Sequence, residues 1–123
     1  MDIKKSVFMR LSTLGYDVKD EDELAIEFLI THIENQIKMF TNLTCVPEGL
    51  NYEWIDAVCA AFLKSQLANG KLENVSSIVK NIQEGDTSVT FDDSLTPEKQ
   101  LIKYLETMAL RPHAMCRYRV MLW

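Results

Sequence analysis

At 123 residues, with 47% apolar and 25% charged residues, the chain has the size and composition of one globular domain. Its formal net charge of −5 argues against a protein that holds nucleic acid through the phosphates. No apolar run approaches the roughly 18 residues that a membrane span needs, and the start MDIKKSVFMRL lacks the apolar core of a signal peptide. We therefore expect a protein without membrane contact that stays in the compartment where it is made.

The first half of the chain predicts two amphipathic helices. Over residues 2–14, apolar residues recur every three or four positions, with Asp2 placed as the N-cap and Gly15 as the stop. A second helix is expected over residues 21–41, where Asp20 and Glu23 resemble a capping box. The apolar stripe of this second helix consists of Ile26, Leu29, Ile30, Ile33, Ile37 and Phe40.

A third helix is expected over residues 52–68, after a link that contains Pro47 and Gly49. It is apolar almost all round, with only a narrow polar strip at Glu53, Asp56 and Lys64. Such a helix is buried on most sides. Because a chain of this size has little material to cover it, we expect a subunit contact here.

Residues 78–91, IVKNIQEGDTSVTF, predict an antiparallel β-hairpin within the range of about 75–92. Pairing the apolar sets on one face requires a turn of even length, Glu84-Gly85 or Gln83 to Asp86. The resulting register places Ile78 opposite Phe91 and Lys80 opposite Val89. One face of this ribbon would then lie on the helices, and the other would meet water or a partner.

The last helix is predicted to begin at Thr96-Pro97-Glu98, which supplies an N-cap, a proline at the first helical position and an acid in the first turn. It ends by Arg111-Pro112. The chain is acidic up to Glu106, with a net charge of −8, and its remainder carries +3 from three arginines. We therefore divide it into a helical domain, residues 1–110, and a basic C-terminal arm, residues 111–123.

The sequence contains no catalytic constellation, phosphate-binding loop or zinc framework. His32 and His113 have no metal-ligand companions at the usual spacings, and the odd number of cysteines (Cys45, Cys59 and Cys116) predicts buried free thiols. The acidic run at residues 20–23 is typical of a solvated face. We expect no enzymatic activity and no cofactor or metal.

Three segments resemble the head–tail connector (adaptor) proteins of long-tailed bacteriophages and their prophages. They are ENQIKMFTNLTCVPEGLNYEWIDAVCAAFL at 34–63, VSSIVKNIQEGDTSVTF at 75–91 and the ending RYRVMLW at 117–123. With the order of the helices, the resemblance covers most of the chain. It implies a mainly α fold: a four-helix subunit with one small antiparallel β-hairpin and an extended C-terminal arm.

The resemblance also implies a virion protein, made in the cytoplasm of a bacterial host and located at the head–tail junction. Its subunits would form a ring under the portal protein, extend the channel through which DNA passes without sequence-specific binding, and hold a tail-side completion or stopper protein. The residues expected to dock on the portal are Arg111, Arg117, Tyr118, Arg119, Leu122 and Trp123. Those expected to face a neighbouring subunit or the channel are Trp54, Lys80, Glu84, Gly85, Asp86 and the acids from Asp20 to Glu23.

An alternative function remains open from the sequence. Arg117-Tyr118-Arg119 could stack on a base, which would make the chain a small helical regulatory module that contacts nucleic acid through its arm. The acidic balance of the chain favours docking on a protein over docking on DNA.

Overall fold

The computed structural model describes residues 2–70, 75–76, 78–80, 96–110 and 115–116. Its main elements are α1 (Ile3–Thr13), α2 (Glu23–Thr41), α3 (Asn51–Ala68) and α5 (Pro97–Met108). Two 3-10 turns, Asp20–Asp22 and Glu48–Leu50, precede α2 and α3. The described part of the chain is mainly helical, which confirms the predicted fold class at that level.

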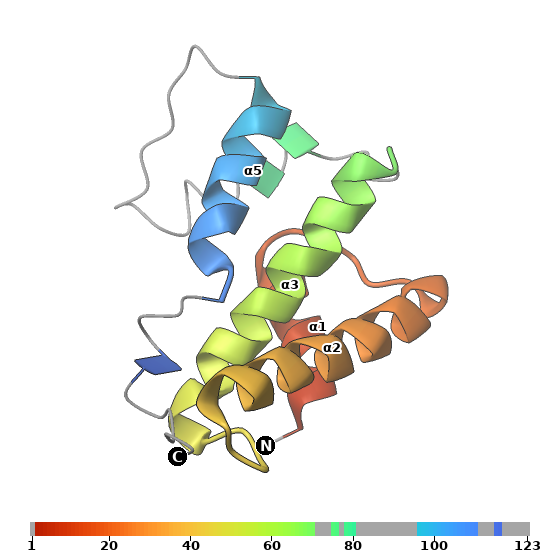
Figure 1. Cartoon of the computed structure of the whole chain (residues 1–123). Coiled ribbons are helices and arrows are strands. Elements are labelled where there is room, and N and C mark those ends of the chain that lie inside the picture. The colour runs from red at the N-terminus through yellow and green to blue at the C-terminus, as the bar shows by residue number, and fades with distance from the viewer. Residues whose placement is uncertain (1, 71–74, 77, 81–95, 111–114, 117–123) are drawn as a thin grey trace.

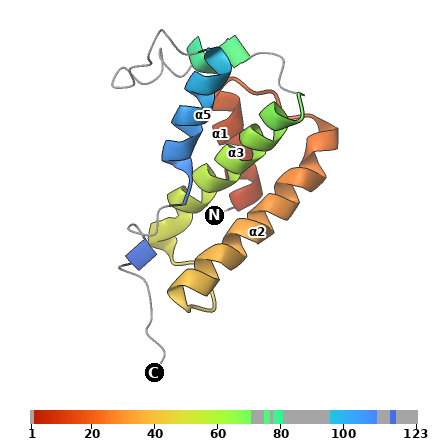
Figure 2. The same ribbon diagram turned by 45° about the horizontal axis from the view of Figure 1, so that its top comes forward.

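Helix α3 runs through the centre of the molecule, with α2 and α5 on its two sides and α1 behind it (Figure 1). The buried face of α3 extends over most of its circumference, as its composition predicted. Its buried residues are Ile55, Ala57, Val58, Cys59, Ala60, Phe62, Leu63 and Gln66. Within the described residues, α1, α2 and α5 therefore cover much of the most apolar helix, which Figure 2 shows from a second direction.

The caps of α1 and α5 form where the sequence predicted them. Asp2 accepts a hydrogen bond from the backbone N–H of Lys5, and Thr96 accepts one from that of Lys99, with Pro97 at the first helical position. Gly15 follows α1 with a φ of 92°, a conformation that a side chain would strain. These local signals fix the helix ends independently of packing.

The predicted capping box at α2 is wrong. Residues Asp20–Asp22 form a 3-10 turn, and α2 begins only at Glu23, with no side-chain hydrogen bond at its N-cap, Asp22. The Asp22 carboxylate instead bonds to groups that lie outside the helix, so it is not available to cap α2.

The first strand of the predicted hairpin is also wrong. Residues 75–76 and 78–80 are helical. Ile78 and Val79 are both buried, with only 1% and 6% of their surface exposed, although successive residues of a strand point to opposite faces. Together with Val75 they follow the helical spacing of three and four residues and join the core. The remainder of the predicted hairpin, residues 81–92, lies outside the described residues.

Candidate functional site

Of the residues that the sequence assigned to docking or neighbour contact, the structure describes Trp54, Lys80 and the four acids from Asp20 to Glu23. Trp54 is half-buried on α3, and its indole N–H donates a hydrogen bond of 3.1 Å to the backbone oxygen of Ile30 on α2. Its polar atom is therefore engaged within the subunit. Lys80 is exposed and is the last of the described helical residues 78–80. Glu84, Gly85, Asp86 and the six residues of the arm lie outside the described residues.

The acidic run at residues 20–23 does not behave as one solvated face. Asp20 and Glu21 are exposed, whereas Asp22 is buried and accepts a hydrogen bond of 2.7 Å from the Tyr16 hydroxyl. The Gln66 amide donates to both of these side chains, at 3.0 and 3.2 Å. Burial, and then the bond to Asp22, raise the pKa of Tyr16 to about 12. This cluster fastens the link before α2 onto α3.

Glu23, the last of these four acids, forms a different contact, with α1. Lys4 of α1 forms ion pairs with Glu23 and with Glu27 on α2, the latter at 2.8 Å. These hydrogen bonds, that with Glu23 first, raise the pKa of Lys4. Of the four acids expected to face a channel or a neighbour, Asp22 and Glu23 are therefore used inside the subunit, and only Asp20 and Glu21 remain available.

The outer side of α2 carries exposed apolar side chains, which we call surface A: Leu24, Phe28 and Met39. Phe28 is 70% exposed, and its ring stacks parallel to that of His32, with 6.0 Å between the ring centroids. The three residues of surface A lie at spacings of one and three helical turns, so they follow one side of α2 opposite the buried Ile26 and Ile33. Leu24 and Phe28 adjoin at one turn, and Met39 lies three turns further along; exposed large apolar side chains that gather on one face are typical of a contact surface.

A second apolar area, surface B, lies between α1 and the beginning of α3. Met9 and Tyr52 are exposed there beside a recess of about 400 Å³, and Tyr52 is 72% exposed. The Arg10 guanidinium and the Asp56 carboxylate, which also line the recess, form an ion pair at 3.2 Å. Surface B thus combines apolar side chains with a charged pair, as interfaces often do.

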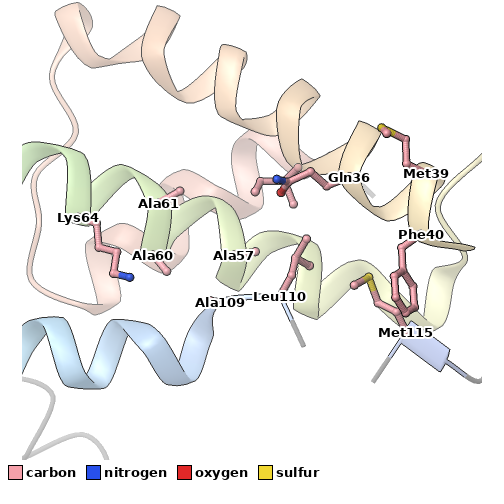
Figure 3. Close-up of a pocket in the computed structure, with 11 residues that line it drawn as sticks. Gln36, Met39, Phe40, Ala57, Ala60, Ala61, Lys64, Ala109, Leu110 and Met115 are labelled. Atoms are coloured by element: carbon pink, nitrogen blue, oxygen red, sulfur yellow. The ribbon is translucent and has the colours of Figure 1, made fainter. Parts of the chain in front are cut away.

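A groove of about 690 Å³ separates α2 from the chain that follows α5 (Figure 3). Its floor is formed by three small residues of α3, namely Ala57, Ala60 and Ala61, and Lys64 lies at one end. Gln36, Met39 and Phe40 line the side of α2, while Ala109, Leu110 and Met115 line the opposite side. Tyr52 and Ala61 are nine residues apart, about two and a half turns, so surface B and the groove lie on opposite sides of α3.

The cysteines divide into two kinds. Cys59 is buried on α3, and its thiol donates to the backbone oxygen of Val7 at 3.7 Å. Burial, followed by the Asp56 carboxylate, raises the pKa of Cys59 to about 12, which keeps the thiol protonated and unreactive. Cys45 and Cys116 are exposed, so the prediction of buried thiols is correct for Cys59 alone. Within the described residues, no group of three or more His, Cys, Asp or Glu side chains could hold a metal ion.

No family model, curated protein or solved structure matches this chain. Among the helices in the described part, none has the length and apolar character to cross a membrane.

Surfaces A and B were not found from the sequence. Leu24, Phe28 and Met39 are apolar residues that lie outside the apolar stripe predicted for α2. Their position off the stripe is the sequence signal from which surface A could have been predicted. Two different apolar surfaces on one subunit allow each copy to contact two others by unlike faces. Such heterologous contacts build rings or filaments.

Proposed function

We propose that this protein is the head–tail connector of a long-tailed phage or prophage. In this role it forms a ring under the portal protein, extends the DNA channel and holds the tail-side protein. The resemblance of three segments to that family supports the proposal. The observation that carries it is the presence of two unlike apolar surfaces, A and B, on a small helical subunit.

Surface A of one copy contacts surface B of the next in this proposal. The large side chains Phe28 and Tyr52 are exposed to a similar degree, 70% and 72%, and burying one aromatic side chain against another in an interface is favourable. A contact between unlike faces repeats from copy to copy and closes into a ring when the rotation per step permits it.

The charge of the chain suits a channel through which DNA slides. Residues 1–106 carry a net charge of −8, and such walls do not bind phosphates as basic walls would. The basic arm, residues 111–123, docks on the portal in this proposal, through Arg111, Arg117, Tyr118, Arg119, Leu122 and Trp123. Lys80, exposed in the structure, and the turn Glu84 to Asp86 remain proposed contacts with a neighbour or the channel.

Sedimentation velocity of the chain, alone and with the portal protein of the same phage genome, tests the proposal. We expect ring-sized oligomers in at least one of these conditions. Phe28→Glu in surface A and Tyr52→Glu in surface B should each abolish them, because a charge in an apolar interface is costly to bury. Ile102→Glu is the matched control, since Ile102 is exposed on α5 outside both surfaces.

A strictly monomeric chain that also does not bind the portal protein would contradict the proposal. Gel shifts at moderate salt separate it from the alternative function. Tight, salt-sensitive binding to DNA would favour a nucleic-acid-binding module.

A further inference from the structure

The groove between α2, α3 and the chain after α5 is open to solvent although its walls are mostly apolar. Its floor consists of alanines, and Phe40, Leu110 and Met115 contribute apolar side chains at its sides (Figure 3). A volume of about 690 Å³ lies in the range of sites that bind drug-sized ligands, and would hold a few large side chains. Contact between the apolar walls of the groove and water is unfavourable, so filling the groove with apolar side chains would lower the free energy.

The chain itself leads into this groove. Met115 is buried beside Phe40 at one end of the groove, while Ala60, Ala61 and Lys64 lie towards the other end (Figure 3). From Ala57 to Lys64 the floor is about 10 Å long, at roughly 1.5 Å per helical residue. The seven residues from 117 to 123 reach up to about 23 Å when extended. They can therefore turn back at Met115 and cover the whole floor.

The composition of this segment matches the groove. In the sequence, Arg117 and Arg119 come shortly after Met115, and four consecutive apolar residues come next: Val120, Met121, Leu122 and Trp123. Because the segment is joined to the groove's own rim, its effective concentration there is in the millimolar range or above. At this effective concentration, a weak apolar contact is sufficient to hold the segment in the groove. A second molecule that binds in the groove must compete with the segment.

We propose that residues 120–123 of the same chain bind in the groove between α2 and α3 and shield it from solvent. The inference goes beyond the proposed connector function and does not depend on it. It adds a form of control, however, since an arm held in its own groove must be released before Leu122 and Trp123 can dock elsewhere. A partner that binds the arm would then uncover the groove.

Tryptophan fluorescence tests this inference on the full-length chain. The protein has two tryptophans, so Trp54→Phe leaves Trp123 as the only reporter; circular dichroism checks that this variant stays folded. We expect Trp123 to emit at shorter wavelength than in the urea-unfolded chain, and acrylamide to quench it several-fold less. Ala61→Glu and Met39→Glu, which place a charge on the groove, should each restore the emission and quenching of the unfolded chain.

Leu24→Glu is the matched control, because Leu24 and Met39 lie on the same helix with exposures of 78% and 79%, and only Met39 lines the groove. It should leave Trp123 protected. Emission and quenching of Trp123 that equal those of the unfolded chain would overturn the inference, as would unchanged protection in both groove variants. Protection that disappears on dilution would assign the bound arm to another copy and overturn the assignment to the same chain.

Discussion

The two sides of α3 are built in different ways. On the side of α1, large side chains such as Leu11 and Phe62 are fully packed, and Cys59 donates to the backbone oxygen of Val7. The recess of surface B lies only at the beginning of α3, where Arg10 pairs with Asp56. On the side that faces the groove, α3 presents alanines, and space of about 690 Å³ remains. We call these the closed side and the open side of α3.

The difference indicates that the two sides serve different purposes. The closed side determines the stability of the subunit, because removing atoms from a packed core leaves a cavity. The open side contributes less to stability, since alanine side chains are small and bury little apolar surface; Ala57 and Ala60 are buried and Ala61 is half-buried. Substitutions of similar size should therefore have unequal effects on the two sides.

The largest effect is expected for Phe62→Ala on the closed side. Phe62 is fully buried, and its ring meets that of Tyr16 edge to face at 5.3 Å between centroids. We expect a loss of about 3–5 kcal/mol in the free energy of unfolding, measured by urea denaturation. Phe28→Ala removes the same atoms from surface A and should change that free energy by no more than about 0.5 kcal/mol. Equal losses for the two variants would contradict the account.

A smaller loss is expected for Asp22→Ala. The Asp22 carboxylate accepts hydrogen bonds from Tyr16, Gln66 and the backbone N–H of Lys19, and its removal leaves buried donors without a partner. The free energy of unfolding should fall by about 1–3 kcal/mol. Asp20→Ala, at an exposed position of the same acidic run, is the control and should have almost no effect. A neutral result for Asp22→Ala would show that the cluster does not hold the link.

Two buried groups on the closed side of α3, the Cys59 thiol and the Tyr16 hydroxyl, make the stability depend on pH. The pKa of Cys59 rises from 9.0 to about 12 on folding, and that of Tyr16 from 10.0 to about 12. Because the unfolded chain releases these protons at lower pH than the folded chain does, stability should fall as pH rises above about 9. Cys59→Ala should make this fall shallower in denaturation curves at increasing pH, whereas Cys45→Ala, at an exposed thiol, should not. An unchanged slope in Cys59→Ala would contradict the assignment.

The smallest effect on stability is expected for Ala61→Leu on the open side. The added side chain enters the groove, so the free energy of unfolding should change by less than about 1 kcal/mol. Cys59→Leu enlarges a side chain on the closed side and should cost about 1–3 kcal/mol through overpacking. Thermal denaturation of both variants checks this pair, and a reversed order would show that the groove is already filled by rigid packing.

The four main helices could be predicted because local signals and apolar spacing agree in them. Asp2, Gly15, Thr96 and Pro97 define helix ends by hydrogen bonding and backbone geometry alone. The strand predicted over residues 78–82 is wrong at 78–80 because Ile78 and Ile82 were assigned to one face of a strand without weighing Val75. The set Val75, Ile78 and Val79 has helical spacing, and burial on the core selects it.

The remaining features depend on tertiary contacts that no single segment encodes. Asp22 belongs to an acidic run, and its burial follows only from the approach of Tyr16 and Gln66, the latter 44 residues away. Surfaces A and B and the groove likewise depend on which sides of α1, α2 and α3 are left uncovered. For α3, composition indicates that most sides are buried, but not which neighbour covers each.

The head-to-tail contact between surfaces A and B is the central claim, and a mixing experiment tests it most directly. Phe28→Glu removes surface A and keeps B, while Tyr52→Glu removes B and keeps A. Under conditions in which the unsubstituted chain assembles, each variant alone should sediment as a monomer. Their mixture should form dimers and nothing larger, because one intact A–B pair remains. A mixture that stays monomeric, or a single variant that still forms rings, would contradict the claim.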